Sequence, residues 1–253
     1  MGRWGYQGVG SRVAAGLACV ALTFCACASK GPADGLDRSL YVVDVAPRPD
    51  DGLLPVNPRI DIVFNRYLDT ADLTYFNAIS LESGGVRAWD RAVYRLTGKR
   101  ATLIVRSELQ GSLYYDMSFN PEVLRSVEGY PFAGPDSIRF EVGEDLAEYP
   151  APQVPEWSDV APLFEACDEC HGDEEWLLPR MDPEGMVGVW SEQAPSLLLV
   201  RPGDASQSYL MHKILPDYPL RDGTVQPPPW AGLSALSEGE LDLVERWIQG
   251  GAQ

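Results

Sequence analysis

A short run in the second half of the chain combines two thiols and an imidazole. Cys167 and Cys170 are separated by two residues, and His171 follows the second cysteine directly. In a helical segment the two sulfurs lie about one turn apart, so both reach the vinyl groups on one edge of a porphyrin. The histidine then lies beneath the ring, where one nitrogen binds iron and the other donates to a carbonyl. This C-x-x-C-H spacing is typical of a covalently attached c-type haem.

The same spacing also suits a redox C-x-x-C pair or plain disulfide, half of a zinc site, or two buried cysteines beside an unrelated histidine. A structural zinc site needs four ligands. Outside the run, the expected mature chain offers one histidine, His212, and one cysteine, Cys27, which lipidation would consume. The run therefore favours one haem c, attached to Cys167 and Cys170, with His171 as axial iron ligand.

The first residues have the features of an export signal, which haem attachment outside the cytoplasm requires. Arg3 and Arg12 form a basic start, and residues 13–26 are uncharged, mostly apolar and too short to favour a spanning helix. The segment resembles a bacterial lipoprotein signal, which implies lipidation of Cys27 and anchoring to a membrane face. Ordinary secretion with cleavage near Ala28 is the alternative. We expect a location in the cell envelope, in the periplasm or at the outer membrane.

The composition is acidic, and the acid is concentrated in the half that carries the C-x-x-C-H run. The chain has 37 Asp and Glu against 20 Lys and Arg. Residues 151–253 contain 18 acids and five bases, whereas residues 1–150 contain 19 acids and 15 bases. Nucleic acid is therefore not an expected partner. A redox partner with a basic face would be steered to the acidic half at low salt, although solubility alone also accounts for the charge.

Polar and proline-rich stretches divide the chain. The stretch before residue 157 contains Pro150, Pro152 and Pro155, which favour an extended spacer. The expected boundaries are 1–27 for the signal, 28–38 for a tether, 39–143 for a first domain, 144–156 for a linker and 157–253 for a second domain.

The first domain alternates apolar and polar residues in short stretches separated by turns, as antiparallel strands do. In residues 59–64, for example, Ile60, Ile62 and Phe64 share one face. Seven such stretches are expected as strands: 40–45, 59–64, 78–82, 92–96, 101–105, 113–119 and 137–142. This number suits a small all-β sandwich.

Several motifs of the first domain resemble those of bacterial Ig-like domains on exported proteins. Residues 47–57 are similar to an early turn of that family, and residues 64–68 to the Phe-Asn-x-x-Leu signature that follows it. Residues 113–115 and 129–132 are similar to a late strand and turn. The resemblance implies an N-terminal Ig-like β-sandwich that acts as a spacer or docking module. No catalytic residues are expected in it.

The second domain is expected to consist mostly of helices joined by loops rich in proline and glycine. Residues 159–167 can form a helix that ends at the first cysteine of the run. A further helix is expected over residues 206–214. Ser237 and Glu240 form a capping box for a last helix over residues 241–249, which has an apolar face.

This order of helices resembles that of a cytochrome c subfamily found in multidomain exported bacterial proteins. The sequences of residues 201–206 and 247–252 are also similar to that subfamily. The resemblance implies a mostly α, cytochrome c-like haem domain. Members typically carry Met-Pro-Pro before the last helix, and that methionine is the sixth iron ligand. Here the corresponding residues are 226–228, Gln-Pro-Pro. Met211 or His212 is the expected replacement.

Further residues of the second domain are expected around a haem. Met181 and Met186 would reach the iron if the loop after the run folds across the ring, although methionines also fill cores. Arg201 would neutralise a haem propionate, although a surface role accounts for it equally well. Four aromatic residues are expected as walls or as ordinary packing: Phe164, Trp190, Tyr209 and Trp230.

The identity of the sixth iron ligand distinguishes electron transfer from the binding of a gas or peroxide. Iron with two protein ligands exchanges electrons with little rearrangement, whereas an open position binds a diatomic gas or peroxide. The sequence favours an exported single-electron carrier rather than an enzyme. The alternatives are a haem-based gas sensor or peroxidase-like enzyme with an open sixth position, and a non-redox surface-binding protein.

Overall fold

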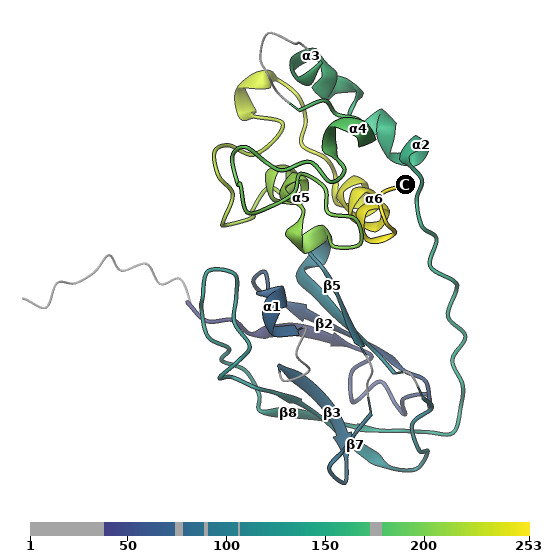
Figure 1. Cartoon of the computed structure of the whole chain (residues 1–253). Helices are drawn as coiled ribbons and strands as arrows, with labels where there is room; N and C mark the ends of the chain where they lie inside the picture. The colour runs from purple at the N-terminus through teal and green to yellow at the C-terminus, as the bar shows by residue number, and fades with distance from the viewer. Residues whose placement is uncertain (1–37, 74–77, 89–90, 106, 173–178) are drawn as a thin grey trace, which may run out of the picture. The chain divides into compact units, whose positions relative to one another are not determined.

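The computed structural model describes residues 38–73, 78–88, 91–105, 107–172 and 179–253 (Figure 1). Residues 38–253 form one compact unit, in which strands come first and short helices follow. Within the described ranges, no helix combines the length and the apolar character needed to cross a membrane. The expected signal and Cys27 lie outside the described residues.

The strands of the first half form a sandwich of two antiparallel sheets. In the described ranges, their order is β1-β2-β6-β5 in one sheet and β4-β3-β7-β8 in the other. The strands are β1 Val42–Ala46, β2 Arg59–Phe64, β3 Ile79–Ser83, β4 Val86–Arg87, β5 Arg91–Arg95, β6 Arg100–Ile104, β7 Tyr114–Phe119 and β8 Ser137–Glu141. The first short helices are α1 Thr70–Leu73 and the 3-10 turn η1 Thr97–Lys99. Each of the seven expected strands is confirmed, and β4 was missed because two residues carry no periodicity.

The core of the sandwich comes from the strand residues that alternate toward the opposite sheet. Ile60, Ile62 and Phe64 of β2 are at most 2% exposed, and they belong to the same buried cluster as Leu81 of β3 and Met117 of β7. Each of these residues contributes apolar area removed from water, which is the main stabilising term of such a core. The expected all-β sandwich is therefore confirmed.

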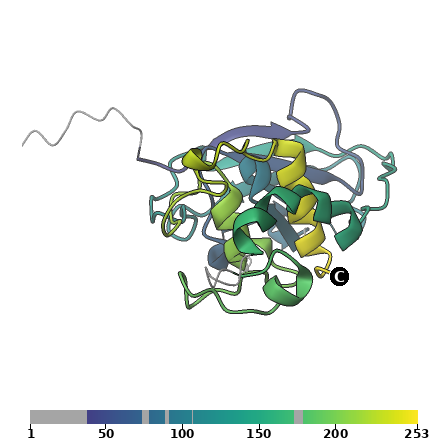
Figure 2. The same cartoon turned by 90° about the horizontal axis from the view of Figure 1, so that it is seen from above.

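The second half contains short helices joined by long irregular loops. The helices are α2 Trp157–Val160, α3 Asp168–His171, α4 Pro183–Met186, α5 Tyr209–Ile214 and α6 Glu238–Gln249. The 3-10 turns are η2 Ala161–Leu163, η3 Glu165–Cys167, η5 Ala205–Gln207 and η6 Pro229–Ala231. Seen from above, the yellow helix α6 lies among the short green helices (Figure 2).

The expectation of a mostly α, cytochrome c-like domain in this half is wrong. The regular structure of the described residues includes two four-stranded sheets, and apart from α6 the described helices after residue 156 have four to six residues. No group of three or more His, Cys, Asp or Glu in those ranges could hold a metal ion. The expected helix over 159–167 is divided into α2, η2 and η3 because Pro162 has no N–H to continue the helical bonding.

The last helix, α6, is confirmed with its cap. The Ser237 hydroxyl accepts from the Glu240 amide, and the Glu240 carboxylate accepts from the Ser237 amide at 2.7 Å. This reciprocal bonding satisfies amide groups that the first turn leaves without helical partners. Its apolar face is buried, with Val244 and Ile248 at 0% exposure.

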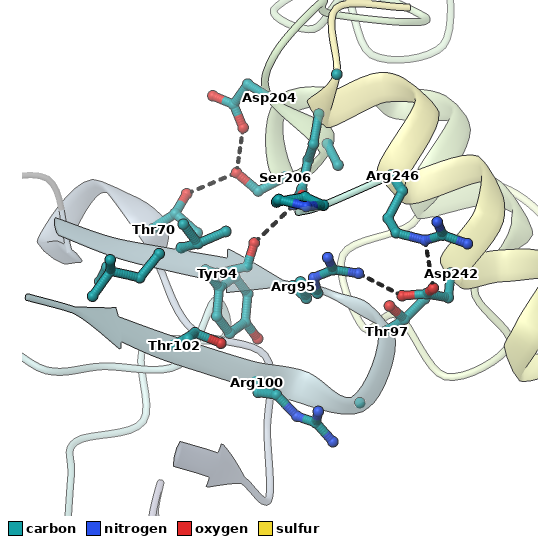
Figure 3. Close-up of a pocket in the computed structure, with 18 of the residues that line it drawn as sticks. Thr70, Tyr94, Arg95, Thr97, Arg100, Thr102, Asp204, Ser206, Asp242 and Arg246 are labelled. Atoms are coloured by element: carbon teal, nitrogen blue, oxygen red, sulfur yellow. Dashed lines mark hydrogen bonds and ion pairs between the residues drawn. The ribbon is translucent and has the colours of Figure 1, made fainter. Parts of the chain in front are cut away.

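Another face of α6 forms hydrogen bonds with the connection between β5 and β6. Glu245 is 0% exposed, and its carboxylate accepts from the Leu96 amide at 2.6 Å, the Thr97 amide at 2.9 Å and the Thr97 hydroxyl. Beside it, Asp242 bridges Arg95 at 2.6 Å and Arg246 at 2.8 Å (Figure 3). The carboxylates of α6 therefore link the two halves of the unit.

Removal of the Glu245 carboxylate should weaken the whole compact unit. We expect Glu245→Ala to lower the free energy of unfolding by about 3 kcal/mol, because buried donors of Leu96 and Thr97 lose their acceptor. The matched control is Glu238→Ala, on the exposed first turn of the same helix, which should cost less than about 1 kcal/mol. Urea denaturation followed by tryptophan fluorescence measures both. Equal losses in the two variants would contradict the assigned role.

Candidate haem site

The larger of the two main cavities in the described residues, here called the interface groove, lies between β5, β6 and α6. Its volume is about 1470 Å³, and polar and charged side chains line much of it (Figure 3). Its charged groups include the paired Arg95, Asp242 and Arg246, and Arg100 lies 3.5 Å from Asp61. Its described lining contains neither cysteine nor histidine. The interface groove therefore lacks the thiols and the imidazole of the C-x-x-C-H run.

The smaller cavity, here called the apolar cavity, contains residues of that run. Its volume is about 550 Å³, and Cys167 and His171 both line it. Much of the remaining lining is aliphatic or aromatic, including Phe164, Leu199 and Leu210. A cavity of roughly 300–1,000 Å³ with apolar walls and a few polar groups is typical of a cofactor site. The structure therefore combines the histidine and one cysteine with space for a large apolar group.

Helix α3 and the Pro179 carbonyl orient the His171 ring. His171 is the last residue of α3, and its Nδ1 lies 3.0 Å from the carbonyl oxygen of Pro179. Because a carbonyl only accepts, Nδ1 carries the proton and donates it, and Nε2 keeps its lone pair. A backbone carbonyl is the type of acceptor expected for a metal-binding histidine. Nε2 is thus the nitrogen available to a metal.

The two cysteines are free thiols with different environments. Cys167 is partly buried against the apolar cavity, and Cys170 is exposed. Burial raises the pKa of the Cys167 thiol, and Asp168 and Cys170 raise it further. A redox-active C-x-x-C pair instead needs a thiol whose pKa is lowered. The environment of Cys167 therefore differs from that of a reactive thiol in a redox C-x-x-C pair.

An aromatic row joins the motif to α6. The Trp157 ring lies 5.3 Å from the Trp247 ring and 5.9 Å from the Phe164 ring, between ring centroids. Phe164 lines the apolar cavity, and its carbonyl accepts from the Cys167 amide at 2.9 Å. These contacts fix the start of the C-x-x-C-H run relative to the long helix.

The structure does not bring the expected sixth ligands together with His171. Met211 is 0% exposed and does not line the apolar cavity. His212 lies outside that lining too, stacked on the Tyr218 ring at 4.0 Å between centroids, with Nε2 2.9 Å from the carbonyl oxygen of Ser206. Burial lowers the pKa of His212. In this arrangement Met211 and His212 act as core residues.

Three further residues singled out in the sequence do line the apolar cavity. Gln226 lies there, and so do Met181 and Met186. A thioether can bind haem iron, whereas a neutral amide is a poor iron ligand. Of the expected aromatic walls, Phe164, Trp190 and Tyr209 line the cavity, and Trp230 is exposed outside it.

Sequence reasoning missed three charged residues of the lining, Arg180, Glu192 and Lys213. Lys213 lines the apolar cavity, whereas Arg201, the expected partner of a propionate, is exposed outside it. The spacing of residues could have indicated Lys213. It lies four residues after Tyr209 on α5, so it shares a helix face with an expected wall residue.

Comparison with known families identifies the first half of the chain. Residues 37–142 match the family model described as a bacterial Ig-like domain. This part of the chain is a bacterial Ig-like domain. The matched range ends within one residue of β8, so the match covers both sheets of the sandwich. No curated protein matches the chain.

Similar solved structures include surface-layer proteins and a CopC protein. The N-terminal part of the bacterial S-layer protein SbsC is 14% identical, with a TM-score of 0.32 over 42% of this chain and 24% of that chain. The S-layer protein rSbsC(31-844) is 15% identical, with a TM-score of 0.32 over 47% of this chain and 16% of that one. CopC from Methylosinus trichosporium OB3b is 19% identical, with a TM-score of 0.32 over 44% of this chain and 99% of that one. The chain thus covers about a quarter or less of these two S-layer proteins.

The buried environment of His212 predicts a dependence of stability on pH. Because its pKa is lowered in the folded protein, the unfolded chain binds the proton more readily. Its contribution should be complete above the ordinary histidine pKa of about 6.5 and be lost as the pH falls through the folded value. His212→Gln keeps a donor for the Ser206 carbonyl but cannot titrate, so we expect a flatter profile between about pH 7 and 5.

The measurement is urea denaturation of haem-free protein across this pH range. An identical slope for wild type and His212→Gln would contradict the prediction.

Proposed function

We propose that the second half of the chain holds one covalent haem c and that the protein transfers single electrons. The observation that carries the proposal is the shared position of Cys167 and His171 on the apolar cavity, with His171 Nδ1 bonded to the Pro179 carbonyl. That bond leaves Nε2 as the free ligand nitrogen. The proposal depends on the attachment run and the cavity, and requires no mostly α fold.

The residues of the run would hold the group in a defined way. Each thiol of Cys167 and Cys170 would add across a vinyl group, so that a carbon–sulfur bond forms and the thiol hydrogen passes to the neighbouring carbon without an oxidant. His171 Nε2 would bind iron, and the Pro179 carbonyl would keep that ring oriented. A bound haem c would supply a one-electron iron couple. The apolar walls, including Phe164 and Leu199, would exclude water from it.

An electron-transfer role also needs a route for a partner to approach. Trp190 lines the apolar cavity while remaining 64% exposed, so the cavity reaches the surface there. Residues 151–253 carry 18 acids against five bases. A redox protein with a basic docking face is therefore the proposed partner, and its association should weaken as salt rises. The Ig-like domain, fixed to α6 through Glu245, would act as a spacer or as a second docking module.

A second candidate function is a gas sensor or peroxidase-like enzyme with an open sixth position. It is favoured by the cavity lining, which contains Gln226 and contains neither Met211 nor His212. Met181 and Met186 line the same cavity and would instead complete a six-coordinate iron. Ligand binding to the reduced protein separates the two functions.

Haem attachment is tested by expressing the protein with its signal in a host that can attach haem c. We expect the intact mass of the purified protein to include one haem, and the reduced spectrum to be of the low-spin c type. Cys167→Ala and Cys170→Ala should each remove one covalent link, and the double variant should release the haem in acid acetone. The control Arg201→Met leaves both thiols of the run in place and should keep one haem.

The same samples test both candidate functions. A reduced spectrum that carbon monoxide leaves unchanged supports electron transfer, and a shifted spectrum supports the sensor or peroxidase function. A colourless protein without added mass would overturn both and would favour a non-redox surface-binding protein.

We further propose that Cys27 is lipidated and anchors the protein in the cell envelope. The basis is the sequence of the signal segment, with an uncharged, mostly apolar stretch directly before that cysteine. Cys27→Ser should move the protein from the membrane fraction to the soluble periplasmic fraction, measured by fractionation and immunoblotting. Cys25→Ser is the matched control and should leave the protein in the membrane fraction. A membrane-bound Cys27→Ser variant would contradict the lipid anchor.

A further inference from the structure

Lys213 is a buried cation on the wall of the apolar cavity. The residue is 9% exposed, and its Nζ lies 3.1 Å from Gln193 Oε1 and 3.0 Å from the carbonyl oxygen of Asp222. Both of these acceptors are neutral. In the described parts of the chain, no carboxylate forms an ion pair with Lys213. The ammonium group therefore lies on the cavity wall with hydrogen bonds but without an ion pair to a described carboxylate.

This arrangement is costly without a carboxylate in direct contact with the ammonium group. A buried charge loses its hydration, and neutral acceptors compensate that loss only in part. Burial accordingly lowers the pKa of Lys213, Arg221 lowers it further, and Asp222 opposes them. The Tyr209 hydroxyl also lies 3.0 Å from both acceptors of Lys213, and its single hydrogen donates to one of them at a time. Without the ammonium group, one of the two oxygens would therefore still have a donor.

We propose that Lys213 binds a carboxylate of the molecule that fills the apolar cavity, and that this carboxylate is a propionate of a tetrapyrrole. The inference rests on the proposed function and adds the residue that fixes the polar edge of the group. A charge-assisted hydrogen bond from an ammonium to a carboxylate supplies the ion pair that Lys213 lacks among the described residues. It would also add a polar contact to the hold that the proposed thioether bonds and His171 provide.

The other cations near the cavity suit this role less well. Arg180 lines the cavity, but its guanidinium is paired with Asp182 and its side chain is 68% exposed. Arg201 is exposed and lies outside the lining. Arg221 lies outside the lining too, and it donates to the Leu215 carbonyl at 2.6 Å. Lys213 is the described cation that is buried, lines the cavity and lacks an acidic partner.

The test compares two porphyrins that differ only in their carboxylates. The parent protein is the full chain with Cys167→Ala and Cys170→Ala, in which binding is reversible. It is titrated with haemin and with haemin dimethyl ester, and the quenching of tryptophan fluorescence gives the two dissociation constants. We expect the parent to bind haemin about tenfold more tightly than the ester.

Lys213→Met in this parent should remove the tenfold preference by weakening haemin binding, while binding of the ester stays as in the parent. Lys213→Arg should keep the preference, because it keeps the cation. The matched control Arg201→Met removes one positive charge from the same half and should also keep it. Far-UV circular dichroism establishes that each variant is folded.

The outcomes separate this inference from the proposed function. A preference that survives in folded Lys213→Met overturns the role of Lys213 and leaves the haem proposal intact, since both porphyrins still bind. A parent that binds both porphyrins equally overturns it as well. Failure of the parent to bind either porphyrin, together with a wild-type protein that lacks added haem mass, overturns the proposed function and this inference with it.

Discussion

The structure of residues 38–253 depends on the burial of α6 on more than one side. Val244, Trp247 and Ile248 are fully buried, and the Glu245 carboxylate is buried at the same time against the connection between β5 and β6. A single helix thus carries apolar packing for the second half and polar anchoring to the Ig-like domain. A buried carboxylate is tolerated here because amide and hydroxyl donors of Leu96 and Thr97 replace its hydration.

The C-x-x-C-H run is positioned by side-chain packing rather than by a long helix of its own. Trp247 of α6 contacts Trp157, Trp157 stacks on Phe164, and the Phe164 carbonyl accepts from the Cys167 amide. A half built from helices of four to six residues depends on such contacts, because short helices have little stability by themselves. The same row of rings brings a wall residue and an attachment cysteine to one cavity.

The apolar cavity combines an oriented imidazole, a protonated thiol and an ammonium group that forms no ion pair with a described residue. The state of each group has a physical cause. His171 Nδ1 donates to the Pro179 carbonyl, and burial raises the pKa of the Cys167 thiol. The hydrogen-bond acceptors of Lys213 are neutral. The interface groove is larger, yet its arginines and aspartates are largely paired with one another. Chemistry, rather than size, therefore selects the smaller cavity as the candidate site.

The sequence by itself determined the features that depend on neighbouring residues. The period of two in residues 59–64 predicted β2 and the other strands of the sandwich, and the Ser237 and Glu240 pair predicted the start of α6. The spacing of the C-x-x-C-H run identified the candidate attachment site. These signals are local, because a pleat, a cap and a thioether pair are each set within a few residues.

Only the tertiary structure decided how distant segments meet. It broke the expected helix at Pro162, buried Met211 and His212 away from the apolar cavity, and brought Gln226 and Lys213 to its wall. Sequence patterns could not decide these points. The loops around the six-residue helix α5 are rich in proline, and their course determines which side of the helix faces the cavity. No local periodicity of the sequence predicts the course of such loops.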